Sequence, residues 1–193
     1  MFIPDFNKSQ LLDRLKYTMT KKDVLWIVNE FREQKLDTEE LISLSISNDT
    51  AFAFHSAWVL ENILLSKPQG IDFYLPRLVE LLPTISNDSV KRHFTKLISI
   101  GIRRVVFKEV SRSFEREFWA MDLEPLEDIC FIWFVEEDTK PAVKVNALVI
   151  LYLLSTREPW IAKELPDIIE NQMQISSPGF RAKAKHILRL LKN

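Results

Sequence analysis

The chain has 193 residues and a formal net charge of −1, with 47% hydrophobic and 27% charged residues. These values suit one globular domain and give it no overall attraction to nucleic acid or to an anionic membrane. Only three glycines occur, so we expect helices joined by short connections, because a sheet with many tight turns needs glycine at positive φ.

The amino-terminal segment, Met1 to Phe6, lacks the basic start and apolar stretch of a signal peptide. No apolar run approaches the ~20 residues of a membrane span. The single cysteine, Cys130, excludes an internal disulfide and lies in an apolar run, so we interpret it as a buried core residue. We therefore expect a cytoplasmic protein without a membrane partner.

Apolar residues recur at helical spacing along the first half of the chain. A short helix is expected after Asp37, which can act as N-cap with Glu40 three residues later. Asn87-Asp88-Ser89 forms a similar cap. The longer predicted helices cover residues 21–34, 50–66, 71–82 and 87 to about 100.

Residues 101–137 depart from this regularity, and we expect an irregular middle hairpin there. One helix is predicted over residues 103–119, broken near Met121-Asp122, and a second over 123–135 with Pro125 in its first turn. Beyond this segment, the predicted helices cover residues 140–154, 160–173 and 177 onward, the last capped by Ser177.

Two stretches of the chain match each other at an offset of 90 residues. Ala57-Trp58-Val59-Leu60 aligns with Ala147-Leu148-Val149-Ile150, and Leu75-Pro76 with Leu165-Pro166. Each Leu-Pro is expected in the first turn of the second helix of a hairpin. Stacked pairs of helices with a period of ~40 residues are typical of α-solenoids. The predicted fold is therefore all-α: a right-handed α–α superhelix of helical hairpins, forming a single domain over residues 1–193.

The run from Lys140 to Leu148, followed by Leu165-Pro166 and by Phe180 to Ala184, resembles HEAT and armadillo-type repeats. The resemblance covers roughly residues 48–100 and 138–193. It implies a superhelical array and, by analogy, a partner-binding surface. The chain also resembles short bacterial helical proteins, some of which carry an adenylosuccinate lyase label. The Ser-Ser-x-Met-Pro-x-Lys-x-Asn loop of that enzyme has no counterpart here.

No residue pattern predicts a catalytic, cofactor-binding or metal site. The three histidines, His55, His93 and His186, each lie in a helix without a second His or Cys at i+3 or i+4. Neither a Gly-rich phosphate loop nor a Gly-x-Ser-x-Gly turn is present. Carboxylates cluster between Glu115 and Asp138, and we interpret them as a solvated acidic turn, because a metal or acid–base role needs converging side chains.

The second helices of stacked hairpins usually line the concave side of a solenoid. The polar positions expected on that side, and therefore the candidate partner-binding residues, are Arg77, Glu80, Asp167 and Glu170. We predict a non-catalytic protein-interaction or scaffold module that binds a protein or a peptide and needs no cofactor.

An alternative is a nucleic-acid-binding protein. Basic residues gather in segments 91–112 and 181–192, and the chain has five tryptophans, of which Trp160 is expected to be partly exposed. In one groove they would resemble the HEAT-like alkylpurine DNA glycosylases, strongly basic enzymes that combine aromatic residues with an acidic partner. Mixed charges along the groove favour the protein partner, and a continuous positive stripe favours nucleic acid.

Overall fold

The computed structural model describes residues 8–31, 37–175 and 177–192. Within these ranges every regular element is a helix, which confirms the all-α prediction. The elements are α1 (Lys8–Arg14), α2 (Lys21–Phe31), α3 (Thr38–Ser45), α4 (Thr50–Ser66), α5 (Gln69–Leu81), the 3-10 turn η1 (Leu82–Thr84), α6 (Asp88–Val106), α7 (Arg112–Trp119), α8 (Glu124–Val135), α9 (Pro141–Leu154), α10 (Pro159–Ile175) and α11 (Pro178–Leu191).

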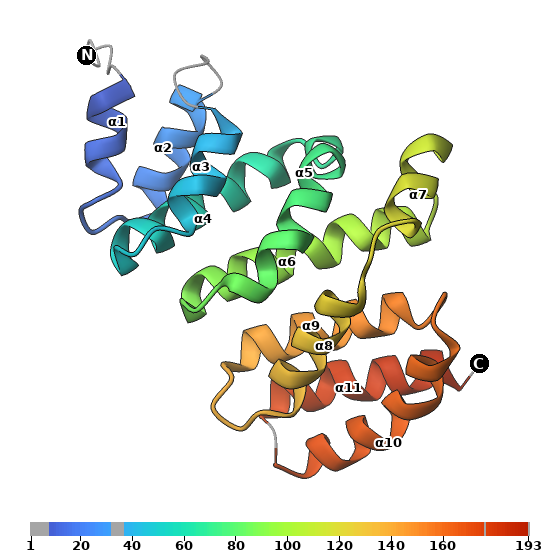
Figure 1. Cartoon of the computed structure of the whole chain (residues 1–193). Coiled ribbons are helices and arrows are strands. Elements are labelled where there is room, and N and C mark those ends of the chain that lie inside the picture. Colours follow the sequence, from blue (N-terminus) through green and yellow to red (C-terminus); the bar gives the residue numbers. More distant parts are fainter. Residues whose placement is uncertain (1–7, 32–36, 176, 193) are drawn as a thin grey trace.

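The helices stack as hairpins in two rows (Figure 1). In one row, α4 packs on α6, α6 on α9, and α9 on α11. The helix that precedes each member in the chain packs beside it: α3 beside α4, α5 beside α6, α8 beside α9 and α10 beside α11. This arrangement is the HEAT-like stack of hairpins expected from the repeat. The hand of the superhelix and the division into one domain stay predictions.

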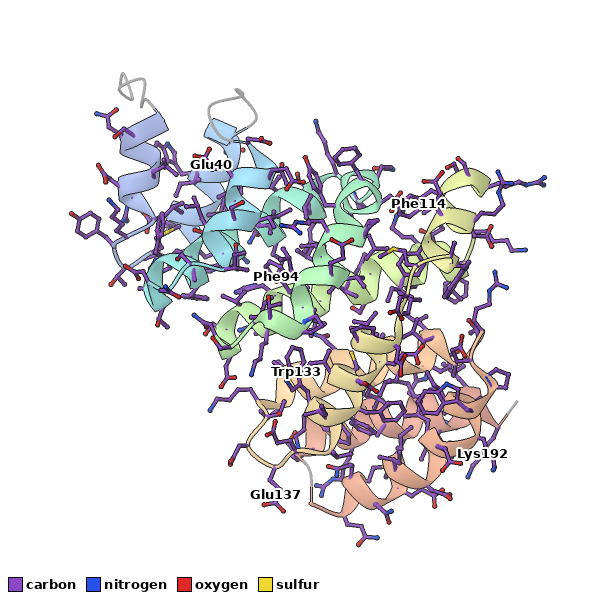
Figure 2. All side chains as sticks on the ribbon, viewed as in Figure 1. Glu40, Phe94, Phe114, Trp133, Glu137 and Lys192 are labelled. Carbon is purple, nitrogen blue, oxygen red and sulfur yellow. The ribbon has the colours of Figure 1, made fainter. Side chains whose placement is uncertain are left out.

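The core follows the first row of helices. Helix α9 is apolar on nearly all sides, with buried residues from Val143 to Leu154, because it packs against α6, α8, α10 and α11. Figure 2 shows Phe94 of α6 and Trp133 of α8 inside the molecule, whereas Glu137 and Lys192 lie at its edge. Gly101 lets α5 approach α6 closely, since a Cβ there would lie 2.7 Å from Cδ1 of Leu75.

The two repeated prolines lie in helix interiors, so the expectation that Leu-Pro stands in the first turn is wrong. Helix α5 begins at Gln69, well before Pro76, and α10 begins at Pro159, well before Pro166. Each proline removes one backbone hydrogen bond. The preceding turns stay helical because they bury apolar residues, among them Ile71 and Ile161.

The prediction of one helix over residues 103–119 is also wrong. Helix α6 continues to Val106, and the chain then turns with Lys108 in the left-handed conformation, at φ 56°. Two bonds close this turn: Lys108 N–H donates to the Val105 carbonyl (3.1 Å) and Glu109 N–H to the Arg104 carbonyl (2.8 Å). Ser111 caps α7 by accepting from the N–H of Phe114. The end of α6 is hard to predict from the sequence because lysine occupies the position where such turns usually have glycine.

A partly buried ion cluster joins α4 to α6. His93 Nδ1 donates to Oε2 of Glu61 (2.6 Å), and Lys96 Nζ donates to Oε1 (2.5 Å). Glu61 and His93 are both buried, and Phe54 stacks on the imidazole. Burial raises the pKa of Glu61, but the bonds from His93 and Lys96 outweigh it, so the pKa lies below its ordinary value of 4.5.

We expect Lys108→Gly to raise the free energy of unfolding by about 0.5–1 kcal/mol, because glycine adopts φ 56° without steric strain. Urea unfolding at pH 7 measures the change. Lys108→Ala is the control, since it removes the charge but keeps the strain and should give no gain. A glycine variant no more stable than the wild type would contradict the assignment of strain to this turn.

We expect Glu61→Gln to destabilise the protein by about 2 kcal/mol at pH 7, because the buried imidazole and the ammonium lose their anion. The pKa of Glu61 is lowered by folding, so its contribution is complete above pH 4.5 and is lost as the pH falls below that value. Denaturant unfolding at pH 7 and pH 3.5 measures both values. The difference between variant and wild type should shrink at the lower pH, and a constant difference would refute the linkage.

Candidate functional site

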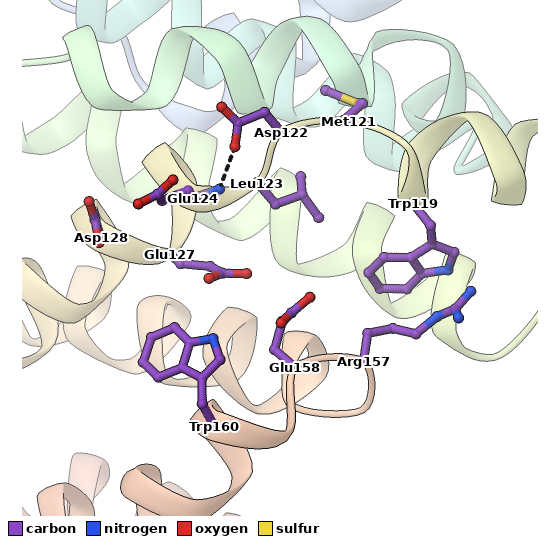
Figure 3. Close-up of a pocket in the computed structure, with 10 residues that line it drawn as sticks. All are labelled: Trp119, Met121, Asp122, Leu123, Glu124, Glu127, Asp128, Arg157, Glu158 and Trp160. Carbon is purple, nitrogen blue, oxygen red and sulfur yellow. Dashed lines mark hydrogen bonds between the residues drawn. The ribbon is translucent and has the colours of Figure 1, made fainter.

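An open pocket of about 700 Å³ lies where the link between α7 and α8 faces the turn between α9 and α10 (Figure 3). Its wall combines carboxylates, indoles and one guanidinium. The lining residues are Trp119, Met121, Asp122, Leu123, Glu124, Glu127, Asp128, Arg157, Glu158 and Trp160.

Local hydrogen bonds and helix ends place these side chains. Helix α7 ends at Trp119, and Oδ1 of Asp122 then accepts from the N–H of Glu124 (3.1 Å) at the start of α8. Glu127 follows within the first turn of α8. On the other side, α9 ends at Leu154 and α10 begins at Pro159, so the intervening turn carries Arg157 and Glu158 to the pocket.

Each indole in the pocket is held by one neighbour. The guanidinium of Arg157 lies over the Trp119 ring, 5.1 Å from its centroid. Trp160 stacks on Phe131 of α8, with centroids 5.4 Å apart. Trp160 is nevertheless 47% exposed, which confirms the expectation that it lies partly in solvent.

Glu127 is the unusual residue of this pocket. The residue is only 7% exposed, yet no residue in the described part of the chain gives its carboxyl a hydrogen bond or an ion pair. Figure 3 shows the carboxyl pointing into the pocket, toward that of Glu158. Burial raises the pKa of Glu127 to about 7, helped by the charges of Glu158, Asp128 and other nearby carboxylates. Burial of the residue and the neighbouring carboxylates both disfavour the charged form of Glu127, so this position costs stability at neutral pH, which suggests a role in function.

The sequence interpretation of the carboxylates between Glu115 and Asp138 as a solvated acidic turn holds only at the carboxy-terminal end of the segment. Glu136, Glu137 and Asp138 form an exposed turn, as expected. The acidic residues at the start of α8 instead line one pocket with Glu158, which the sequence places some thirty residues away from Glu127. The sequence feature that could have indicated this pocket is an acidic residue close to each of two tryptophans: Asp122 near Trp119 and Glu158 near Trp160.

The four predicted partner-binding residues are exposed and lie outside this pocket. Arg77 and Glu80 on α5 pair with each other at 3.6 Å. Asp167 and Glu170 lie on α10, and Glu170 pairs with Lys192 at 3.5 Å. Helices α6, α8 and α9 lie between α5 and α10 in Figure 1, so the structure separates the two pairs. Their role in binding stays a prediction.

Several basic residues of the first segment are neutralised within the fold. Lys91 pairs with Asp88, Lys96 with Glu61, and Arg104 with Asp72. The two basic segments lie mainly on α6 and α11, which both pack against α9. A basic hollow of about 740 Å³ nevertheless adjoins the acidic pocket and shares Trp119 and Arg157 with it. The further cations that line the hollow are Lys108, Arg112 and Arg116.

No three His, Cys, Asp or Glu side chains converge as a metal site among the residues that the structure describes. Cys130 is fully buried, as the sequence predicted, and burial raises the pKa of its thiol. None of the helices in the described ranges is long and apolar enough to span a bilayer.

Comparison with known families identifies the architecture. A family model described as a HEAT repeat domain matches residues 11–191. The match includes the irregular middle segment, residues 101–137, that the repeat pattern did not cover. No curated protein and no solved structure matches the chain.

We expect Glu127→Gln to stabilise the protein by about 2 kcal/mol at pH 8, less than the full linkage value because the pocket is open to water. Folding raises the pKa of Glu127 from 4.5 to about 7, so its carboxyl favours the folded state below pH 4.5 and loses this contribution as the pH rises through 7.

Urea unfolding of the variant and the wild type at pH 5 and pH 8 tests this sign. The difference between the two proteins should be small at pH 5 and should grow at pH 8. Glu80→Gln, at an exposed position of α5, is the matched control and should show no such growth. A Glu127→Gln variant that is less stable at pH 8 would mean that the carboxylate is satisfied in the folded state.

Proposed function

Because the chain belongs to the HEAT repeat domain family, we propose that it is a non-catalytic module that binds another protein, as an interaction partner or scaffold. HEAT repeats generally mediate protein interaction or scaffolding. The observation that carries the proposal is the family match over residues 11–191, together with a stack of hairpins whose shared core leaves their outer sides as surface. The proposed location is the cytoplasm.

The environment of the reactive side chains supports a binding role. The thiol of Cys130 is fully buried in apolar surroundings. His55 is buried and its Nδ1 pairs with the carbonyl of Leu15 (2.7 Å), while His93 is engaged with Glu61. The acidic pocket is therefore lined by groups that recognise ligands through charge and stacking, and the histidines and the cysteine lie outside it.

Three surfaces are candidates for the partner. The first is the exposed pair Arg77 and Glu80 on α5, and the second is the exposed pair Asp167 and Glu170 on α10. The third is the acidic pocket with its two tryptophans. Because the three surfaces share no residue, charge reversals can be made separately in each.

Nucleic-acid binding is the second candidate function. The basic hollow around Trp119 favours it, since Lys108, Arg112 and Arg116 could contact phosphates. The pairing of Lys91, Lys96 and Arg104 with acidic neighbours neutralises three cations of the first basic segment. We therefore rank this function below protein binding.

Affinity purification of the tagged full-length protein from its native host, followed by mass spectrometry, tests the proposal. We expect a reproducible protein partner whose recovery falls about tenfold in Arg77→Glu/Glu80→Arg, because reversing both charges removes the complementarity of a binding surface. Lys21→Glu/Lys22→Glu, on the exposed side of α2, is the control and should leave recovery unchanged.

The other outcomes are equally informative. A partner that survives the α5 variant but is lost in Asp167→Lys/Glu170→Lys moves the interface to α10. Recovery of nucleic acid that falls steeply with salt supports the second candidate function. No protein above the level of an untagged control would overturn the proposal.

A further inference from the structure

We propose that the acidic pocket binds a lysine or arginine side chain of the partner protein, held near Trp119 and Trp160 and paired with Glu127 and Glu158. This inference rests on the proposed protein-binding function and names the chemistry of the partner: a segment with a basic residue.

The charge of the pocket points to a cation. Five carboxyl groups line it against a single guanidinium. None of the five forms an ion pair within the described part of the chain, and Arg157 lies over Trp119 without pairing with any of them. Elsewhere the fold neutralises carboxylates readily, as at Glu61 and Asp72. An entering cation would relieve the repulsion among these carboxylates, of which Glu127 is buried and Glu158 is half-buried.

Glu127 supplies an independent reason. Its residue is more than nine-tenths buried, its carboxyl has no partner among the described residues, and it points into the pocket. An ammonium or guanidinium group donates hydrogen bonds and also compensates the charge, so it supplies both of the interactions that this carboxyl lacks. A neutral ligand would leave the charge uncompensated.

The indoles fit the same ligand. Tryptophan is the aromatic side chain that attracts cations most strongly. Arg157 already shows that a guanidinium can lie on the Trp119 ring, at 5.1 Å from its centroid. The pocket of about 700 Å³ is far larger than a metal ion requires, and it suits an organic head group with its aliphatic stem.

The neighbouring hollow indicates that the ligand extends beyond one cation. The hollow shares Trp119 and Arg157 with the acidic pocket. Its other charged residues are three cations, Lys108, Arg112 and Arg116, and one carboxylate, Glu115. A chain that follows both spaces meets negative charge in one and positive charge in the other. A peptide segment with a basic residue close to an acidic one matches these two charges, so we assign the site to a protein segment.

The test uses the full-length ¹⁵N-labelled protein and two tetrapeptide probes. The first is acetyl-Asp-Gly-Arg-Gly-amide, and the second has citrulline, the neutral isostere, in place of arginine. Binding is followed at the indole N–H signals of Trp119 and Trp160, assigned with Trp119→Phe and Trp160→Phe. We expect the arginine peptide to shift both signals with a dissociation constant on the order of 1 mM, and the citrulline peptide to bind at least about tenfold more weakly.

Variants connect the signal to the carboxylates. Glu127→Gln and Glu158→Gln should each weaken binding of the arginine peptide about tenfold, since each removes one charge-assisted hydrogen bond. Glu137→Gln, at an exposed position outside the pocket, should bind like the wild type. Equal shifts from the two peptides, no shift at about 20 mM peptide, or wild-type affinity in Glu127→Gln would overturn the proposal. Matching indole shifts from magnesium chloride alone would also overturn it, in favour of a metal site.

The two proposals fail in different ways. A partner recovered from the host whose binding is unchanged in Glu127→Gln/Glu158→Gln would overturn the cation site and leave the protein-binding function. Peptide binding in the pocket, with no protein recovered from the host, would overturn the protein-binding function and leave the cation site.

Discussion

The packing of α9 between four other helices is the constraint on which the rest of the structure depends. Its apolar surface packs against α6, α8, α10 and α11, so the positions of both neighbouring hairpins are set by one helix. The end of α9 then decides where the turn with Arg157 and Glu158 lies. Because protein interiors are close-packed, that turn is held opposite the start of α8. The pocket is thus a consequence of how the core is filled, although no core residue belongs to it.

Two buried glutamates show how differently the fold treats the same side chain. Glu61 receives bonds from His93 and Lys96 and joins α4 to α6, so its charge serves the structure. Glu127 is buried to the same degree and receives none, although its neighbours repel its charge. Stability alone would favour a neutral residue at position 127. Residues that reduce stability without a structural return are concentrated at functional sites, which makes position 127 the centre of the candidate site.

The regular and irregular parts of the chain have different roles in the structure. Regular hairpins build a continuous core, whereas the segment after α6 departs from the repeat with a left-handed Lys108 and the short helix α7. Figure 2 shows α7, with Phe114, projecting from the stack. This departure brings Trp119 and several basic side chains beside the acidic pocket. A rigid scaffold that presents its least regular segment to a ligand is a common arrangement in proteins.

Local features were decided by the sequence itself. The 3.6-residue periodicity and the caps at Asp37, Asn87 and Ser177 depend on neighbours in the chain, and each cap makes the expected backbone bond. Other features needed the tertiary structure. The helix end at Val106, the interior position of Pro76 and the meeting of Glu158 with α8 all depend on packing between distant segments. Periodicity reports which face of a helix is buried, but not which helix covers it, so the HEAT-like stack was predictable and its pocket was not.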